Sequence, residues 1–338
     1  MSAVDHASRL LRANPWGDPA HRDLWVWAPP GHGRAGDARL PAVLVLPDFG
    51  DTAEGLLARR LDAPGLHTRF DHLLAATDCP PFLAVLPDAL STVGGTQYVD
   101  SAGIGAYASW LATEVLPFID GRFRTSGRWA VLGVGSGGFG ALHLAMAFPG
   151  RFAAVGAIAP ELGFGGARSA PAAAIGPIAA AGGPRAFLDA WWAADEAPAA
   201  PLDALRLLCR AAAFGDGTPE DDGFPGRLPA DPRTGALRPE VLAAWARFDL
   251  PARLGAPAAR AALRALDALL LVGRAAAGPD AALRRFAAQA AAAGAPVTFA
   301  SGAGVPPDPP AQLAAQVPAL VAALERSSGG AAAAGPPG

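Results

Sequence analysis

The 338-residue chain contains no lysine, so arginine supplies all 27 of its basic side chains, and these do not gather into a basic run. Acidic residues number 30, and the formal net charge is −3. Proteins that bind nucleic acid need a concentrated positive patch, because the phosphate backbone provides most of their affinity. The sequence therefore excludes a nucleic-acid partner and makes other polyanionic partners improbable.

Cysteine and long apolar segments are also scarce. Cys79 and Cys209 are the two cysteines, too few for a disulfide framework or a cysteine metal site, so each is expected to be a buried free thiol in a reducing compartment. Residues 1–14 carry charges throughout and lack the apolar core of a secretory signal. The longest uncharged stretch, residues 286–307, is interrupted by glycine, proline and polar residues. We predict a cytoplasmic protein without a membrane partner.

What the sequence does contain is 51% hydrophobic residues arranged in short apolar runs that alternate with helical patterns. Runs of this kind between turn residues are typical of strands buried in a parallel sheet and covered by helices on both faces. The fold class is therefore α/β, with a mostly parallel central sheet. Predicted strands are residues 23–28, 42–46, 82–86, 129–133, 153–159, 266–272 and 296–299, and predicted helices are residues 102–118, 138–148, 280–293 and 311–324.

The same pattern suggests how the chain is divided. Residues 23–325 form one predicted domain, preceded by an N-terminal segment over residues 1–22. Residues 163–250 interrupt the alternation with glycine and proline clusters, and we interpret them as a cap-like insertion at the carboxyl edge of the sheet, either a lid or a loop-rich decoration. Residues 326–338 are low in complexity and are predicted to be disordered.

The strand at residues 129–133 runs directly into the glycine-rich turn GVGSGGFGAL at residues 133–142 and then into an apolar helix. A phosphate-binding loop has a similar outline, but it requires a lysine that this chain lacks. A strand, a sharp glycine turn and a helix in succession are typical of the nucleophile elbow of an α/β-hydrolase. This turn is the strongest functional motif in the sequence.

With this turn, other stretches carry a resemblance to a known family: NPWGDP at residues 14–19, GGTQYVDS at 94–101, EVLPFID at 114–120, and Phe123-Arg124. Over about residues 15–325 the chain resembles the α/β-hydrolase esterases that include S-formylglutathione hydrolases, enterochelin-esterase-like proteins and mycolyltransferase relatives. The resemblance implies the α/β-hydrolase fold. It also implies ester cleavage by a serine, a histidine and an acidic residue.

The positions that should hold those catalytic groups do not match. Aligned on its glycines, the elbow places Gly135 at the apex where the family has serine, and Ser136 follows as a displaced candidate nucleophile or a plain helix-start residue. The family's acid falls near Ala276, and its histidine near Gly304, although no histidine follows His143. Where the family has a His-Gly pair beside the oxyanion hole, the chain has Asp48, whose negative charge would oppose the oxyanion.

Other side chains following the strands are candidates for a binding site. Asp48, Asp88 and Glu161 should lie along the carboxyl edge of the sheet, where open α/β sheets bind ligands. There they either hold a cation or a basic ligand, or they cap helices or pair with nearby arginines. The aromatic candidates Tyr98, Trp191 and Trp192 either line a pocket or belong to the core. The candidate ligand-pocket residues are Asp48, Phe49, Asp88, Tyr98, Gly135, Ser136 and Glu161. No metal or cofactor is expected.

We therefore predict a pseudo-esterase, meaning an esterase-family fold without hydrolytic machinery, that binds a small molecule or a protein partner. The first alternative is an active hydrolase that uses Ser136 with support from Glu161 or Asp280, the latter otherwise a helix cap. The second is an oligomeric scaffold, which would show a large apolar surface patch and no closed pocket. The sequence leaves the oligomeric state open.

Overall fold

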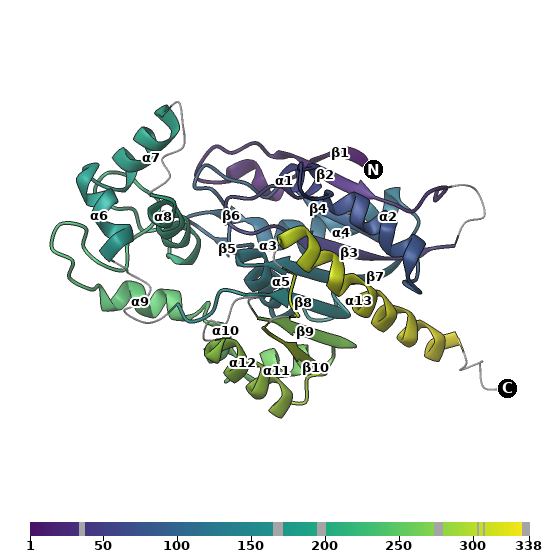
Figure 1. The fold of residues 1–338 in the computed structure, drawn as a ribbon. Coiled ribbons are helices and arrows are strands. Elements are labelled where there is room, and N and C mark those ends of the chain that lie inside the picture. The colour runs from purple at the N-terminus through teal and green to yellow at the C-terminus, as the bar shows by residue number, and fades with distance from the viewer. Residues whose placement is uncertain are drawn as a thin grey trace.

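An eight-stranded sheet forms the centre of the computed structural model, which describes residues 1–33, 38–164, 172–194, 201–273, 280–302, 304–306 and 308–332. Its strand order is β1-β2-β4-β3-β7-β8-β9-β10 (Figure 1). β2 runs antiparallel to both β1 and β4, and the remaining neighbours are parallel. The strands are β1 (Ser2–Ala7), β2 (His21–Trp27), β3 (Leu40–Leu46), β4 (Leu83–Pro87), β7 (Thr125–Val134), β8 (Ala154–Ile158), β9 (Ala268–Val272) and β10 (Val297–Ala300).

The predicted α/β class with a mostly parallel sheet is confirmed. All seven predicted strands are present as β2, β3, β4 and β7 to β10, with shifted ends. β4 and β8 are buried along their whole length, as strands covered on both faces must be. A separate small hairpin pairs β5 (Asp100–Ser101) with β6 (Gly105–Ala106).

The N-terminal segment differs from its prediction. Residues 1–22 were expected to precede the domain, but β1 pairs antiparallel with β2 from Ser2 opposite Val26 to Ala7 opposite His21 and forms the edge of the sheet. Only His6 of this strand is buried. Its sequence, SAVDHA, has no apolar run like those of the central strands. Its ladder with β2 is a tertiary contact that short-range patterning does not reveal.

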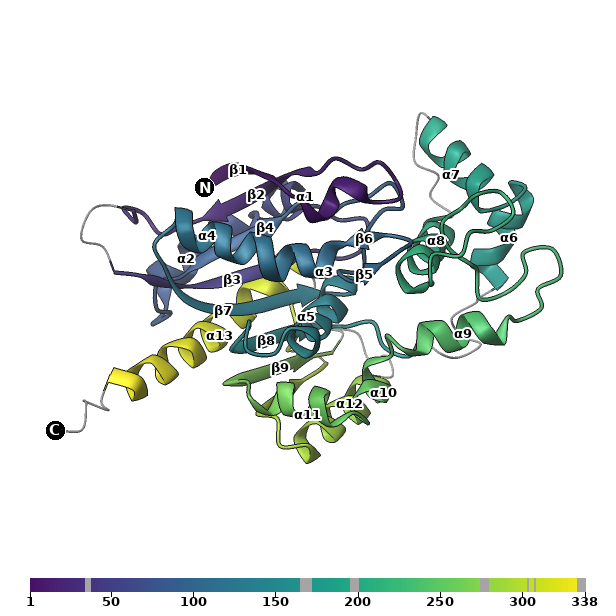
Figure 2. The same cartoon turned by 180° about the vertical axis from the view of Figure 1, so that it is seen from behind.

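Helices cover both faces of the sheet, and the two faces bury alternate residues of each strand (Figures 1 and 2). In β3, Leu44 and Leu46 face one apolar core, whereas Val43 and Val45 face the other. The first core packs against α3 (Tyr107–Ser109), the π-helix η2 (Trp110–Val115), α4 (Leu116–Arg122), α5 (Ser136–Ala147), α11 (Pro257–Arg264) and α12 (Ala281–Ala292). The second packs against α1 (Ala53–Leu57), α2 (Leu66–Ala76) and α13 (Pro309–Ala332).

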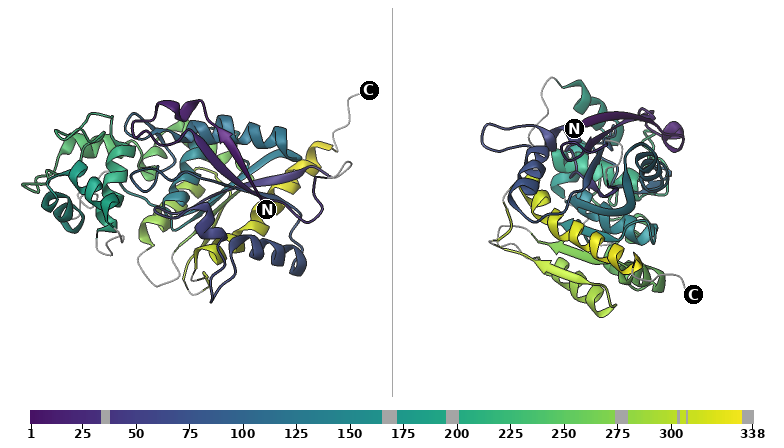
Figure 3. Two further views of the ribbon diagram at one scale, coloured as in Figure 1. Left: turned by 90° about the horizontal axis from the view of Figure 1, so that it is seen from above. Right: turned by 90° about the vertical axis from the view of Figure 1, so that its right-hand side faces the viewer.

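A helical lobe lies beyond one end of the sheet (Figure 3, left). Its helices are α6 (Ala172–Ala180), α7 (Pro184–Ala193), α8 (Leu202–Phe214) and α9 (Pro239–Ala246), followed by the short α10 (Leu250–Arg253). α6 to α9 come from the predicted insertion over residues 163–250, and α10 begins at its last residue. The role of the insertion as a lid stays a prediction. A short 3-10 helix, η1 (Leu10–Ala13), follows β1.

The C-terminal helix extends further than predicted. Disorder was expected from residue 326, but α13 continues to Ala332, while residues 333–338 lie outside the described part of the chain. Leu313, Val317 and Leu320 are fully buried and anchor α13 against the second core. The last turns of α13 therefore continue a helix that is already packed. Among the described helices, none combines the length and hydropathy needed to cross a bilayer.

Candidate functional site

A sharp turn joins the central strand β7 to α5. Gly135 sits at its apex with φ 58° and ψ −116°, a conformation in the left-handed half of backbone space that strongly favours glycine. Its N–H donates to the carbonyl of Ile158 at the end of β8, over 2.9 Å. The next glycine allows close packing, since a Cβ at Gly137 would lie 2.1 Å from the carbonyl oxygen of Leu46. The backbone of a nucleophile elbow is therefore present, and its apex carries no side chain.

The carboxylate of Asp48 occupies the space above that apex. Asp48 follows β3, and its Oδ1 accepts hydrogen bonds from the backbone N–H of Phe49 at 2.7 Å and of Ser136 at 2.8 Å. A Cβ built on Gly135 would lie 2.1 Å from the same oxygen. Any side chain at the apex would collide with this carboxylate, so Gly135 and Asp48 fit each other as a pair.

The two N–H groups have the arrangement of an oxyanion hole. One comes from the loop after β3 and the other from the residue after the apex, and both converge on a single acceptor at 2.7–2.8 Å. In acyl-transfer enzymes such a pair stabilises the negative oxygen that forms in the transition state. Here the chain's own carboxylate takes both hydrogen bonds, which are strengthened by its negative charge.

The elbow leaves almost no free volume. A cavity of about 10 Å³ remains beside it, with room for about one water molecule. The hydroxyl of Tyr98 donates to the carbonyl of Pro47 at 2.8 Å, and burial raises its pKa well above the usual value. Tyr98 thus packs as a neutral wall of the site. Five predicted pocket residues line this cavity: Asp48, Phe49, Asp88, Tyr98 and Ser136.

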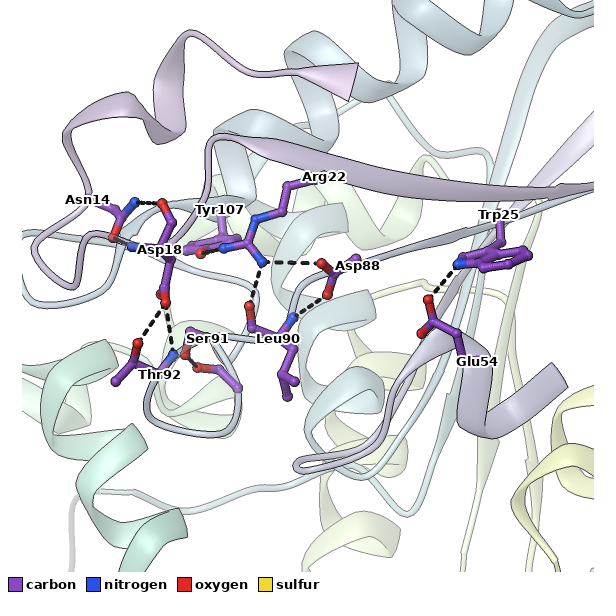
Figure 4. Close-up of polar contacts among 11 residues, drawn as sticks. Asn14, Asp18, Arg22, Trp25, Glu54, Asp88, Leu90, Ser91, Thr92 and Tyr107 are labelled. Atoms are coloured by element: carbon purple, nitrogen blue, oxygen red, sulfur yellow. Dashed lines mark hydrogen bonds and ion pairs between the residues drawn. The ribbon is translucent and has the colours of Figure 1, made fainter. Parts of the chain in front are cut away.

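Asp88 is held in a structural network at the end of β4 (Figure 4). The buried Arg22 donates to Asp88 Oδ2 at 3.3 Å, to the carbonyl of Leu90 at 2.7 Å and to the hydroxyl of Tyr107 at 2.7 Å. Asp88 Oδ1 accepts from the N–H of Leu90 at 3.1 Å. The Asp88 carboxylate therefore holds the loop after β4 in place. The positive charge of Arg22, from β2, balances its negative charge.

Glu161 is paired with the insertion instead of facing the small cavity. Its carboxylate accepts from Arg206 at 2.9 Å and from Arg210 at 2.7 Å, both on α8. Its backbone N–H reaches the carbonyl of Gly135 at 3.3 Å. The arginine pairing that the sequence left open is thus present for Glu161 and for Asp88. Within the described residues, no group of carboxylate, histidine or cysteine side chains is arranged to hold a metal ion.

Histidine does not reach the elbow in this structure. His143, two turns into α5, accepts a hydrogen bond from Arg253 at 2.7 Å, and burial together with that positive charge lowers its pKa to about 3. No described histidine ring hydrogen-bonds to a serine. Gly304 lies in a turn after β10, and Ala276 falls outside the described residues.

Asp280 precedes α12 at the predicted capping position, but its side chain makes no capping hydrogen bond to the helix. Its carboxylate lies over the end of β9, since a Cβ built on Gly273 would come within 2.0 Å of its Oδ2. Asp280 therefore occupies the predicted position without the predicted capping interaction.

Sequence reasoning missed Arg206 and Arg210, which hold Glu161 from a helix more than 40 residues away. Their spacing of four residues on α8 was a usable signal, because it places both guanidinium groups on one helix face. Arg206 also lies 5.0 Å above the ring centre of Phe49. It therefore links the lobe both to the edge of β8 and to the loop that supplies one of the two N–H groups.

Residues 98–217, which include the elbow and α8, match the model of the family described as "Putative esterase". Over this segment, about a third of the chain, the sequence is similar to that esterase family. A comparison with curated proteins finds no match. Several solved structures share the fold over almost their whole length.

A ferulic acid esterase is 16% identical with a TM-score of 0.57, covering 96% of this chain and 97% of its own. An S-formylglutathione hydrolase from Agrobacterium tumefaciens is 16% identical with a TM-score of 0.51, covering 96% and 94%. The fluorophosphonate-binding serine hydrolase FphF from Staphylococcus aureus is 12% identical with a TM-score of 0.51, covering 96% of each chain. These likenesses confirm the predicted α/β-hydrolase fold.

Proposed function

We propose that this protein is a pseudo-esterase: it keeps the fold and the elbow backbone of an ester hydrolase, does not hydrolyse esters, and acts by binding a small molecule or a protein partner. The observation that carries the proposal is the position of Asp48. Its carboxylate accepts both N–H groups that would stabilise an oxyanion and fills the space of the apex side chain.

Energetics favour this function over residual catalysis. Losing a single donor of an oxyanion hole typically lowers kcat by about 10²–10³, and here both donors are engaged. A negative carboxylate at that place also repels the charge that develops on the substrate oxygen. Without a nucleophile, only a factor of about 10³–10⁴ over water could survive through binding and the hole, and this hole is occupied.

The main alternative is a hydrolase that uses Ser136. Ser136 is 3% exposed, and its N–H is bound to Asp48. Glu161, a proposed helper, is held between two arginines. No described histidine ring is hydrogen-bonded to a serine. These contacts provide neither a general base for Ser136 nor an open path to it.

Ester hydrolysis kinetics test the proposal. The purified protein and its Ser136→Ala variant would be assayed with p-nitrophenyl acetate and butyrate, next to an active serine esterase as positive control. We expect both proteins to give the same rate, close to that of buffer with an inert protein. A wild-type rate well above that background and abolished by Ser136→Ala would overturn the proposal.

A further inference from the structure

A second and larger cavity lies where the lobe meets the body of the protein. Its volume is about 150 Å³, and its walls come from α7, the turn before β2, the loop after β4 and the loop after α8. It shares no lining residue with the elbow cavity. Its lining includes Trp16, Thr92, Arg185, Asp189 and Trp192.

Two indole rings in this lining are held in place through their N–H groups. Trp192 Nε1 donates to the carbonyl of Thr92 at 2.8 Å, and Trp16 Nε1 donates to the carbonyl of Gly103 at 2.8 Å. Trp192 is nevertheless 55% exposed. An aromatic side chain this exposed does not gain the free energy that burial would provide. Large exposed aromatic residues are common at sites that a ligand or a partner covers. Its neighbour Trp191 packs against the core and stacks on Phe187.

The loop that carries Thr92 in the cavity wall is tied by hydrogen bonds to Asp18 (Figure 4). Asp18 Oδ1 accepts from both the N–H of Thr92 at 3.0 Å and its hydroxyl at 2.7 Å. The side-chain oxygen of Asn14 accepts from the N–H groups of Trp16 at 3.1 Å and Asp18 at 3.0 Å. Because these bonds fix the loops that carry Thr92 and Trp16, binding there would cost little ordering entropy.

The rim of the cavity offers one donor and one acceptor beside the exposed indole. Arg185, Asp189 and Trp192 follow one another at helical spacing on α7, so they share a face. The Arg185 and Asp189 side chains form an ion pair at 3.3 Å and are 54% and 67% exposed. Their opposite charges cancel, which disfavours a charged ligand and suits a neutral one that can both donate and accept.

We propose that this cavity binds one ring of a carbohydrate. A sugar ring has an apolar C–H face that packs on an indole and a rim of hydroxyls that donate to a carboxylate and accept from a guanidinium. The cavity is also smaller than the roughly 300–1,000 Å³ pockets of drug-sized ligands, as a site for a single ring should be. An aromatic acid would have to compete with Asp189 for the Arg185 guanidinium, which is already paired. The proposal is independent of whether the elbow is catalytic.

Isothermal titration calorimetry with maltotriose, cellotriose and xylotriose tests this site, with 4-hydroxycinnamate as the aromatic-acid comparison. We expect at least one trisaccharide to bind and 4-hydroxycinnamate not to bind. Trp192→Ala should weaken binding about 10-fold or more, since loss of an aromatic contact of about 1.4 kcal/mol corresponds to tenfold in affinity. Asp189→Asn should weaken it by a smaller factor.

The matched control is Trp25→Phe. Trp25 is a partly buried indole of β2 that donates to Glu54 Oε1 at 2.8 Å outside the cavity lining (Figure 4). This variant should bind like the wild type, and thermal melting should show that Trp192→Ala remains folded. The proposal is overturned if none of the three trisaccharides binds, if only 4-hydroxycinnamate binds, or if Trp192→Ala binds as tightly as the wild type. The ester assay would be unaffected by any of these results.

Discussion

The cavity beside the elbow and the cavity lined by α7 differ in what occupies them. Beside the elbow, about 10 Å³ remains, because the carboxylate of Asp48 takes the hydrogen bonds that a ligand would need. Beneath α7, about 150 Å³ is lined by an exposed indole and a half-exposed ion pair. The first site is satisfied by the chain itself, whereas the second keeps groups available to a ligand.

This difference separates fold from function. The elbow retains the backbone geometry associated with hydrolysis, yet its polar groups are saturated internally. The α7 cavity lies where the helical lobe of the predicted insertion meets the body of the protein, and it shares no lining residue with the elbow cavity. A fold can thus keep the form of a catalytic site while its capacity to bind lies elsewhere on the molecule.

The largest effect is expected for Gly135→Ser, which tests whether the elbow is closed. The new Cβ would lie 2.1 Å from Asp48 Oδ1, in a backbone conformation that is strained for any residue with a side chain. We expect the free energy of unfolding, measured by urea denaturation, to fall by about 3 kcal/mol. Because Asp48→Ala removes the collision, the two substitutions combined should lower the free energy of unfolding by less than the sum of their separate effects.

Gly127→Ser is the matched control for that experiment. Gly127 also has a positive φ, of 73°, but a Cβ there meets no atom within 4 Å. It should therefore cost only the backbone strain, about 1 kcal/mol. If Gly135→Ser costs no more than Gly127→Ser, Asp48 does not occupy the apex space.

A smaller effect is expected when the carboxylate is removed alone. Asp48→Ala leaves the N–H groups of Phe49 and Ser136 without their acceptor, which should lower the free energy of unfolding by about 2 kcal/mol. It should also open an anion site, so formate should raise the melting temperature of this variant but not of the wild type. Asp48→Asn, which keeps an acceptor oxygen, should cost less. No difference between variant and wild type in formate would argue against an anion hole.

The last effect concerns acid. His143 is buried on the elbow helix with a pKa lowered to about 3, whereas no histidine is among the residues that line the α7 cavity. The unfolded imidazole takes up a proton below about pH 6.5, but the folded one does not, so stability should fall as pH drops from 6.5 toward 3. The loss should be at most about 1.4 kcal/mol per pH unit.

Urea denaturation at pH 7, 6 and 5 checks this, with His143→Asn as the comparison. The asparagine amide can still accept from Arg253 and does not titrate. His6, whose pKa is also lowered by burial, is present in both proteins and contributes equally. The variant should therefore lose less stability on acidification than the wild type. Equal losses would show that His143 is not the group responsible.

Much of the fold could be predicted from the sequence because the central strands are short, apolar and bounded by turns. β3, β4 and β8 could be recognised in this way. β1 could not, because it has one buried residue and its structure depends on pairing with β2. α2 was missed although a signal was there. Leu66, Phe70, Leu73 and Leu74 are at helical spacing and pack against the second core.

The site was predictable in part. The order of strands and loops placed Asp48 near the oxyanion hole and a glycine at the apex. It did not show that Asp48 Oδ1 accepts both N–H groups, because that depends on how β3 and α5 pack together. The pairing of Glu161 with Arg206 and Arg210 was also hidden, since these residues meet only when the lobe packs against the sheet edge.

Covalent labelling examines the closed elbow most directly. The wild-type protein would be incubated with a fluorophosphonate, alongside an active serine esterase, and its intact mass recorded. We expect the esterase to gain one adduct and this protein to keep its mass, because no serine at the elbow is activated. An adduct that maps to Ser136 and disappears in Ser136→Ala would contradict the assignment of this protein as a pseudo-esterase.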